Sequence, residues 1–153
     1  MAGLSLLEQR KIEARVLIPL IEAFESRLGK REAHEVVRKV IEEASLKRGR
    51  EIASQGIGRP IEEFKSLIPI FCEGGALELV VLNHSHDIYD FNVTRCRYAE
   101  FYKEMGTSDL GFLLSCTRDF ALARGISDKL ELIRTRTIMQ GAGYCDFRLR
   151  LKK

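Results

Sequence analysis

Cys96 lies where an alternating pattern, typical of a strand, changes to a helical one, and it stands between Arg95 and Arg97. The free N–H groups of a helix N-terminus and two guanidinium groups favour the thiolate, which is the nucleophilic form of cysteine. Unpaired cysteine is also among the most buried residue types. Cys96 is therefore either a nucleophile or a small buried side chain at a strand end, and its position alone leaves both open.

Cys116 and Asp119 stand three residues apart in a predicted helix, so the thiol and the carboxylate share one face. Burial of a carboxylate is costly and shifts its pKa toward the range useful for proton transfer. The spacing therefore predicts a candidate acid or base. The alternative is a surface carboxylate that pairs with a neighbouring arginine, such as Arg118 or Arg124.

Arg134 and Arg136 continue one face of a predicted strand, so both point inward if that face meets the core. An inward arginine needs an anion, either a carboxylate of the protein, such as Asp119 or Asp146, or the carboxylate of a substrate. The strand end twisting into solvent is a further alternative. Cys145 and Asp146 are adjacent in the last predicted strand and point to opposite faces.

Familiar cofactor and catalytic motifs are absent. The four cysteines, at positions 72, 96, 116 and 145, match neither a zinc ribbon nor a redox Cys-x-x-Cys, and the three histidines show no metal-binding spacing. The chain also lacks a P-loop, a full dinucleotide-binding glycine motif and the Gly-x-Ser-x-Gly of serine hydrolases. We expect free thiols, no cofactor and no metal. A soft-metal site formed by Cys96, Cys116 and Cys145 is the alternative.

The N-terminal part is predicted to be helical. A long amphipathic helix begins after a capping box at Ser5 and ends at Gly29. Its predicted core-facing stripe is Ile12, Val16, Leu20 and Phe24. A second helix is predicted over residues 30–47, followed by a loose stretch from Gly49 and a short helix that begins at Pro60.

The C-terminal part alternates between strand and helix patterns. A β-hairpin is predicted first, followed by two helices that end at Gly106 and Gly125. A second hairpin follows, with strands predicted over residues 130–138 and 145–151.

This order indicates an α+β fold in one domain, residues 1–153, with a helical part over 1–72 and the hairpin part over 76–152. The N-terminal helices precede two β-hairpins that form an antiparallel sheet of about four strands, with two helices between the hairpins. We expect helices to cover one face of this sheet.

Composition excludes several classes of protein. Lys and Arg number 25 and Asp and Glu number 22, a net charge of +3, which is too small a basic excess for nucleic-acid binding. No stretch of about 18 apolar residues occurs, and charges interrupt the first twenty residues as no secretory signal would allow. We expect a cytoplasmic protein without nucleic-acid or membrane partners. The oligomeric state stays open, a homo-oligomer included.

The candidate residues occur in an order that resembles the L-2-amino-thiazoline-4-carboxylic acid hydrolase family. The similarity extends over residues 77–151, and the helical part before it is similar only in pattern. It is carried by the runs Val93-Thr94-Arg95-Cys96-Arg97-Tyr98-Ala99-Glu100, Ser115-Cys116-Thr117-Arg118-Asp119, Arg134-Thr135-Arg136-Thr137-Ile138-Met139 and Tyr144-Cys145-Asp146-Phe147-Arg148. One departure is Tyr144, where many relatives have histidine.

The resemblance implies a hydrolase that opens a small carboxylate-bearing heterocycle, similar to L-2-amino-thiazoline-4-carboxylate, at a carbon–nitrogen bond of a cyclic amidine. The ring carbon is attacked either by a thiolate, for which we favour Cys96, or by water that a carboxylate deprotonates, with Asp119 as acid or base. The expected catalytic set is Cys96, Asp119, Cys116, Cys145 and Asp146. The expected substrate-binding set is Arg134, Arg136 and Tyr144. A small-molecule-binding or sensor domain without turnover is the alternative.

Overall fold

The computed structural model describes residues 3–153. Two long helices, α1 (Leu6–Leu28) and α2 (Lys30–Gln55), form a hairpin at the N-terminal end. The predicted capping box of α1 is confirmed, because the Ser5 hydroxyl accepts the Glu8 N–H and the Glu8 carboxylate accepts the Ser5 N–H. Within the described residues, no helix is long and apolar enough to cross a membrane.

The rest of the chain consists of short helices around a sheet. The helices are α3 (Pro60–Lys65), α4 (Ile68–Cys72), α5 (Arg97–Glu104), α6 (Ser108–Gly111), the π-helical segment Phe112–Cys116 and α7 (Arg118–Ile126), with 3₁₀ turns at Glu73–Gly75 and Ile138–Gln140. The strands are β1 (Leu77–His84), β2 (Ile88–Cys96), β3 (Leu130–Ile133) and β4 (Cys145–Leu151).

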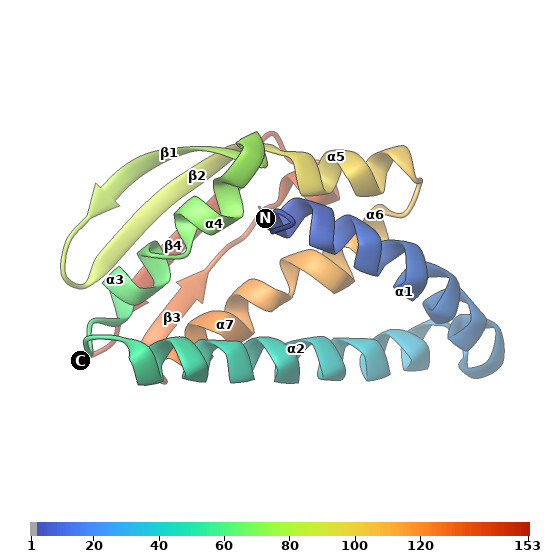
Figure 1. The fold of residues 1–153 in the computed structure, drawn as a ribbon, viewed down its shortest axis with the longest axis horizontal. Coiled ribbons are helices and arrows are strands. Elements are labelled where there is room, and N and C mark those ends of the chain that lie inside the picture. Colours follow the sequence, from blue (N-terminus) through green and yellow to red (C-terminus); the bar gives the residue numbers. More distant parts are fainter. Residues whose placement is uncertain (1–2) are drawn as a thin grey trace.

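The four strands form an antiparallel sheet in the order β1-β2-β4-β3, which confirms the predicted α+β fold (Figure 1). Three alternate residues of β2, Tyr89, Phe91 and Val93, are buried against side chains of α3 and α7. Cys145 of β4 lies opposite Val93, so the predicted strand face that carries Cys145 meets the same core.

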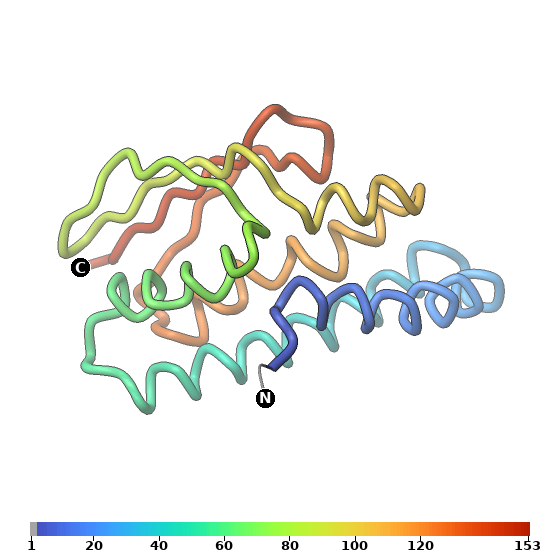
Figure 2. Tube along the Cα trace, turned by 45° about the horizontal axis from the view of Figure 1, so that its top comes forward, coloured from blue at the N-terminus to red at the C-terminus, as the bar shows by residue number. Residues whose placement is uncertain are grey.

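Helix α7 lies between α2 and the sheet, and it touches α2 at two glycines (Figures 1 and 2). A Cβ atom at Gly49 would lie 2.4 Å from the Leu122 carbonyl oxygen, and one at Gly125 would lie 2.3 Å from the Leu46 carbonyl oxygen. The prediction that the second helix ends near residue 47 is therefore wrong. Glycine at position 49 serves the close approach of two helices, and α2 continues to Gln55.

The predicted core face of α1 is also wrong. The expected stripe of Ile12, Val16, Leu20 and Phe24 is exposed. The buried residues of α1 are instead Leu7, Ala14, Ile18 and Ile21, which pack against α5, α6 and the π-helical segment. Helix α1 has apolar side chains at helical spacing on two faces, so periodicity alone does not say which of them meets the core.

The strand predicted over residues 130–138 is shorter than expected, since β3 ends at Ile133. The following backbone leaves the sheet because the Asp146 carboxylate accepts the N–H groups of Thr135 and Arg136, at 2.9 and 2.8 Å. The helix predicted to end at Gly125 is likewise interrupted, by the π-helical segment. The first departure separates Arg134, whose side chain is buried, from Arg136, which is exposed.

Candidate functional site

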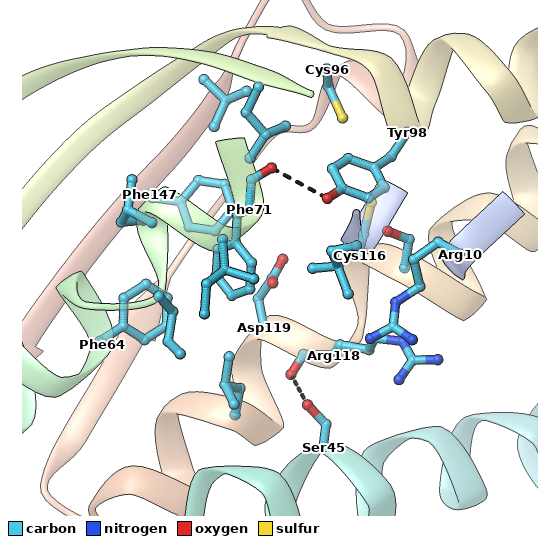
Figure 3. Close-up of a pocket in the computed structure, with 18 of the residues that line it drawn as sticks. Arg10, Ser45, Phe64, Phe71, Cys96, Tyr98, Cys116, Arg118, Asp119 and Phe147 are labelled. Carbon is cyan, nitrogen blue, oxygen red and sulfur yellow. Dashed lines mark hydrogen bonds between the residues drawn. The ribbon is translucent and has the colours of Figure 1, made fainter. Parts of the chain in front are cut away.

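A cavity of about 570 Å³ lies between the helices and the inner face of the sheet (Figure 3). Several elements contribute to its wall: α1, α2, α3, α4, β2, the π-helical segment, α7 and β4. Exposed lining residues mark its mouth, namely Leu4, Arg48 and Ile70. The buried lining residues Phe91, Val93 and Cys145 mark its floor on the sheet.

Five of the residues predicted to carry chemistry line this one cavity. They are Cys96, Cys116, Asp119, Arg134 and Cys145. Cys116 ends the π-helical segment and Asp119 stands in the first turn of α7, and the two side chains share one face as predicted. Tertiary packing therefore brings together side chains from four separate stretches of sequence.

Arg134 is paired within the protein. Its Nη1 donates to Asp119 Oδ2 at 2.6 Å, and its Nη2 donates to the Cys116 carbonyl oxygen at 2.9 Å. Its guanidinium carbon lies 4.9 Å from the ring centre of Phe120 and 5.1 Å from that of Phe147. Only 2% of the Arg134 side chain is exposed. Of the anions considered from the sequence, the Asp119 carboxylate is the one that Arg134 binds, although Arg134 lies beyond the end of β3 and not within a strand.

Asp119 keeps one oxygen free for a ligand. Within residues 3–153, Oδ1 makes no hydrogen bond, and 22% of the side chain is exposed, toward the cavity (Figure 3). Burial raises the pKa of Asp119 above its ordinary value of 3.8, and the nearby Arg134 charge and hydrogen bond offset part of that rise. A carboxylate of raised pKa with an open oxygen can take a proton from water and return it.

The three cavity thiols are held in the protonated form by burial. Cys96 caps the N-terminus of α5 as predicted, and its Sγ accepts the Ala99 N–H at 3.4 Å. Burial nevertheless raises the pKa of Cys96 to about 11, which outweighs the N–H groups that lower it. Burial also raises the pKa of Cys116 and of Cys145.

Three predicted site residues lie outside the cavity. Asp146 holds the backbone after β3, since it also accepts the Thr135 hydroxyl at 2.6 Å. Burial would raise the pKa of Asp146, but hydrogen bonds from Thr135 and Arg136 outweigh burial and lower it. Arg136 is exposed and lies over the Tyr144 ring, 5.1 Å from its centre. The structure thus gives Asp146 a structural contact and places Arg136 and Tyr144 away from the other candidates.

Two cavity arginines were not recognised as a pair from the sequence. Arg10 of α1 and Arg118 of α7 both approach the Glu13 carboxylate, with Nη to Oε2 distances of 2.7 and 3.8 Å. The Arg118 carbonyl oxygen accepts the Ser45 hydroxyl of α2 at 2.8 Å, which fixes the start of α7. Burial lowers the pKa of Arg118, and the neighbouring Arg10 charge lowers it further. The spacing of Arg10 and Glu13, three apart in a helix, was the one local indication of this cluster.

The opposite wall of the cavity is aromatic. Phe64, Phe71 and Phe147 line it, and the Tyr98 hydroxyl donates to the Phe71 carbonyl oxygen at 3.2 Å (Figure 3). Burial raises the pKa of Tyr98 to about 12, so this hydroxyl stays neutral. Among the described residues, no three His, Cys, Asp or Glu side chains are arranged to hold a metal ion. The cavity therefore joins a neutral aromatic wall to a charged one.

Comparisons with known proteins bear on both the sequence and the fold. The model of the L-2-amino-thiazoline-4-carboxylic acid hydrolase family matches residues 9–149, nearly the whole chain. No curated protein matches the sequence. The fold is similar to the phenol-responsive sensory domain of the transcription activator PoxR, solved with phenol, at a TM-score of 0.56 and 10% identity over 99% of this chain and 76% of that one.

A weaker structural similarity links the chain to a trafficking protein particle complex subunit 3 from Naegleria fowleri covalently bound to palmitic acid. The TM-score is 0.48 and the identity is 15%, over 94% of this chain and 97% of that one. At these identities, the likeness to the sensory domain concerns the fold alone.

Proposed function

Because the chain belongs to the L-2-amino-thiazoline-4-carboxylic acid hydrolase family, we propose that it hydrolyses a carboxylate-bearing cyclic amidine at a carbon–nitrogen bond, with Asp119 as the proton-transfer group. One observation carries the proposal. The Asp119 carboxylate lies in the cavity with one oxygen held by Arg134 and the other without a hydrogen bond from any residue of the described range 3–153. Burial raises the pKa of Asp119 above its ordinary value, which suits a group that must both accept and donate a proton.

The proposed reaction uses one water molecule. Asp119 Oδ1 takes a proton from water as the oxygen bonds to the amidine carbon, which gives a tetrahedral intermediate. Asp119 then returns this proton to the ring nitrogen. As the carbon–nitrogen bond breaks, the hydroxyl of the intermediate becomes a carbonyl, its proton passes through Asp119 to the departing nitrogen, and the ring opens to an amine. Arg134 keeps the carboxylate in place through its bond to Oδ2. The product differs from the substrate by the addition of one water.

The state of the thiols supports attack by water over attack by sulfur. With the pKa of Cys96 near 11, about one molecule in ten thousand carries the thiolate at pH 7. Burial keeps the Cys96 thiol protonated, so the residue favoured from the sequence as the nucleophile is not activated. Cys96 and Cys116 then serve as neutral walls beside Asp119.

Turnover of L-2-amino-thiazoline-4-carboxylate by single variants tests this assignment. Asp119→Asn should lower the rate about 10²- to 10⁴-fold, the usual contribution of a general acid or base, whereas Cys96→Ser should stay within about tenfold of the native rate. Mass spectrometry of the ring-opened product, heavier by one water, measures the rate. Asp128→Asn is the matched control, since Asp128 is an exposed carboxylate just beyond α7.

Loss of folding must be separated from loss of chemistry. Asp119→Asn leaves the Arg134 charge unpaired, so the double variant Asp119→Asn/Arg134→Met, which removes both charges, is measured beside it with a melting curve. A folded double variant that still opens the ring at the native rate would contradict the proposal. Activity that survives Asp119→Asn but not Cys96→Ser would instead identify the thiol as the nucleophile.

A ligand-binding or sensor function is the second candidate. The aromatic cavity wall, the protonated thiols and the fold shared with a phenol-responsive sensory domain favour it. Such a domain would show saturable stabilisation by its ligand and no ring-opened product, whereas the hydrolase accumulates product over many turnovers.

A further inference from the structure

The charges on the arginine side of the cavity do not balance. Arg10 and Arg118 carry two positive charges and share Glu13, which carries one negative charge. The two arginine side chains are 23% and 19% exposed, so water only partly compensates the surplus. A bound anion would complete this cluster.

Several donors of the pair are unused. Arg10 directs a single nitrogen, Nη1, to both Glu13 oxygens, at 3.0 and 2.7 Å. Arg118 uses Nε for the Leu114 carbonyl oxygen at 2.6 Å, and its Nη2 is 3.8 Å from Glu13, beyond hydrogen-bond length. Within residues 3–153, Arg10 Nη2 and Arg118 Nη1 have no partner, and no buried side-chain donor is left unsatisfied, so both remain accessible. Two guanidinium edges suit a carboxylate.

Arg134, which lies deeper in the cavity, is less suited to bind a ligand carboxylate. Arg134 lies against two phenylalanine rings with only 2% of its side chain exposed, and it already donates to Asp119 and to the Cys116 carbonyl. A ligand carboxylate that bonded to its Nη1 would compete with Asp119. The recognition of an acid therefore falls to Arg10 and Arg118.

The size and lining of the cavity indicate how large and how apolar the bound acid is. A 2-amino-thiazoline carboxylate has about nine non-hydrogen atoms, and at ~30 Å³ each, the volume of a water, it would fill at most about half of the cavity. The cavity volume of about 570 Å³ lies within the range of pockets for larger organic ligands. The wall opposite Arg10 and Arg118 is apolar and includes the rings of Phe64, Phe71 and Phe147 (Figure 3).

We propose that Arg10 and Arg118 form a carboxylate-binding subsite, and that the natural ligand is an acid with an apolar body larger than a thiazoline ring. The apolar body lies against Phe64, Phe71 and Phe147, and the carboxylate lies between the two guanidinium groups. The inference rests on the proposed function in one respect: the ligand that binds here also carries the cyclic amidine ring that reacts near Asp119. Binding itself requires no turnover.

Calorimetric titration with 4-phenylbutyrate and its neutral amide, 4-phenylbutanamide, tests the subsite. The native protein should bind the acid at least about tenfold more tightly than the amide, and more tightly than acetate. Arg10→Met and Arg118→Met keep the aliphatic stems but remove the charges, and each should abolish most of the preference for the acid. The controls are Arg15→Met and Arg124→Met, which alter exposed arginines on the same two helices, α1 and α7.

Three results would overturn the proposal: equal affinity for acid and amide, no binding of either compound, or a preference for the acid that survives both arginine variants. Arg10→Met, at the more exposed arginine, remains informative if Arg118→Met loses stability. Binding of the acid through these arginines without ring-opened product would refute the hydrolase and leave the subsite intact. If Arg10→Met and Arg118→Met leave turnover unchanged, the subsite is refuted and the hydrolase remains supported.

Discussion

The two charged clusters of the cavity contain the same kinds of residue and differ in their balance. At the floor, one arginine meets one carboxylate, and Arg134 is almost completely buried. On the arginine side, Arg10 and Arg118 share Glu13, whose side chain is 42% exposed. Deep burial requires each charge to be paired, because no water remains to solvate a surplus. Partial exposure permits a surplus, and a ligand can use it. An arginine is therefore available to a substrate when it is partly exposed and its charge is not fully paired within the protein.

The largest effect on stability is expected when the ion pair between Arg134 and Asp119 is broken. Arg134→Met should lower the free energy of unfolding by about 3–5 kcal/mol, because the Asp119 carboxylate then stays buried without its partner. Arg10→Met should cost under about 1 kcal/mol, as for partly exposed pairs. Urea denaturation followed by circular dichroism measures both. The comparison fails if the two variants are equally stable, or if Arg134→Met is stable and loses its preference for the acid ligand.

The pH dependence of kcat/KM gives the second test. A carboxylate base works only when ionised, so activity should fall as the pH drops through the pKa of Asp119. Because burial raises that pKa, this acid limb should lie above the ordinary value of 3.8. A thiolate mechanism through Cys96 would instead give activity that climbs steadily toward pH 11. A flat profile from neutral to alkaline pH, with an acid limb only, supports Asp119.

The smallest expected effect sharpens the comparison at the arginine pair. Glu13→Gln removes the single negative charge that Arg10 and Arg118 share, so 4-phenylbutyrate should bind about two- to fivefold more tightly. The affinity for the neutral amide should not change, which is the internal control for a rearranged cavity. Weaker binding of the acid would show that Glu13 is needed to position the arginines and does not compete with the ligand.

Much of the local structure was predictable from the sequence. The Ser5 capping box, the position of Cys96 at the start of α5 and the common face of Cys116 and Asp119 all depend on residues within one or two helical turns. The opposite directions of Cys145 and Asp146 follow from strand alternation and are confirmed. The resemblance carried by short runs of the C-terminal part is confirmed by the family model, which matches residues 9–149.

Only the tertiary structure decided which of these residues meet. Arg10 and Arg118 come together because α1 packs near the start of α7, and no local period indicates such a contact. The choice of Asp119 as the partner of Arg134, and the exit of Arg136 from the sheet, depend on Asp146 holding the backbone after β3. The sequence by itself determined which faces and ends of elements carry chemistry. Packing decided burial, and burial sets both the pKa of a group and whether its charge is free for a ligand.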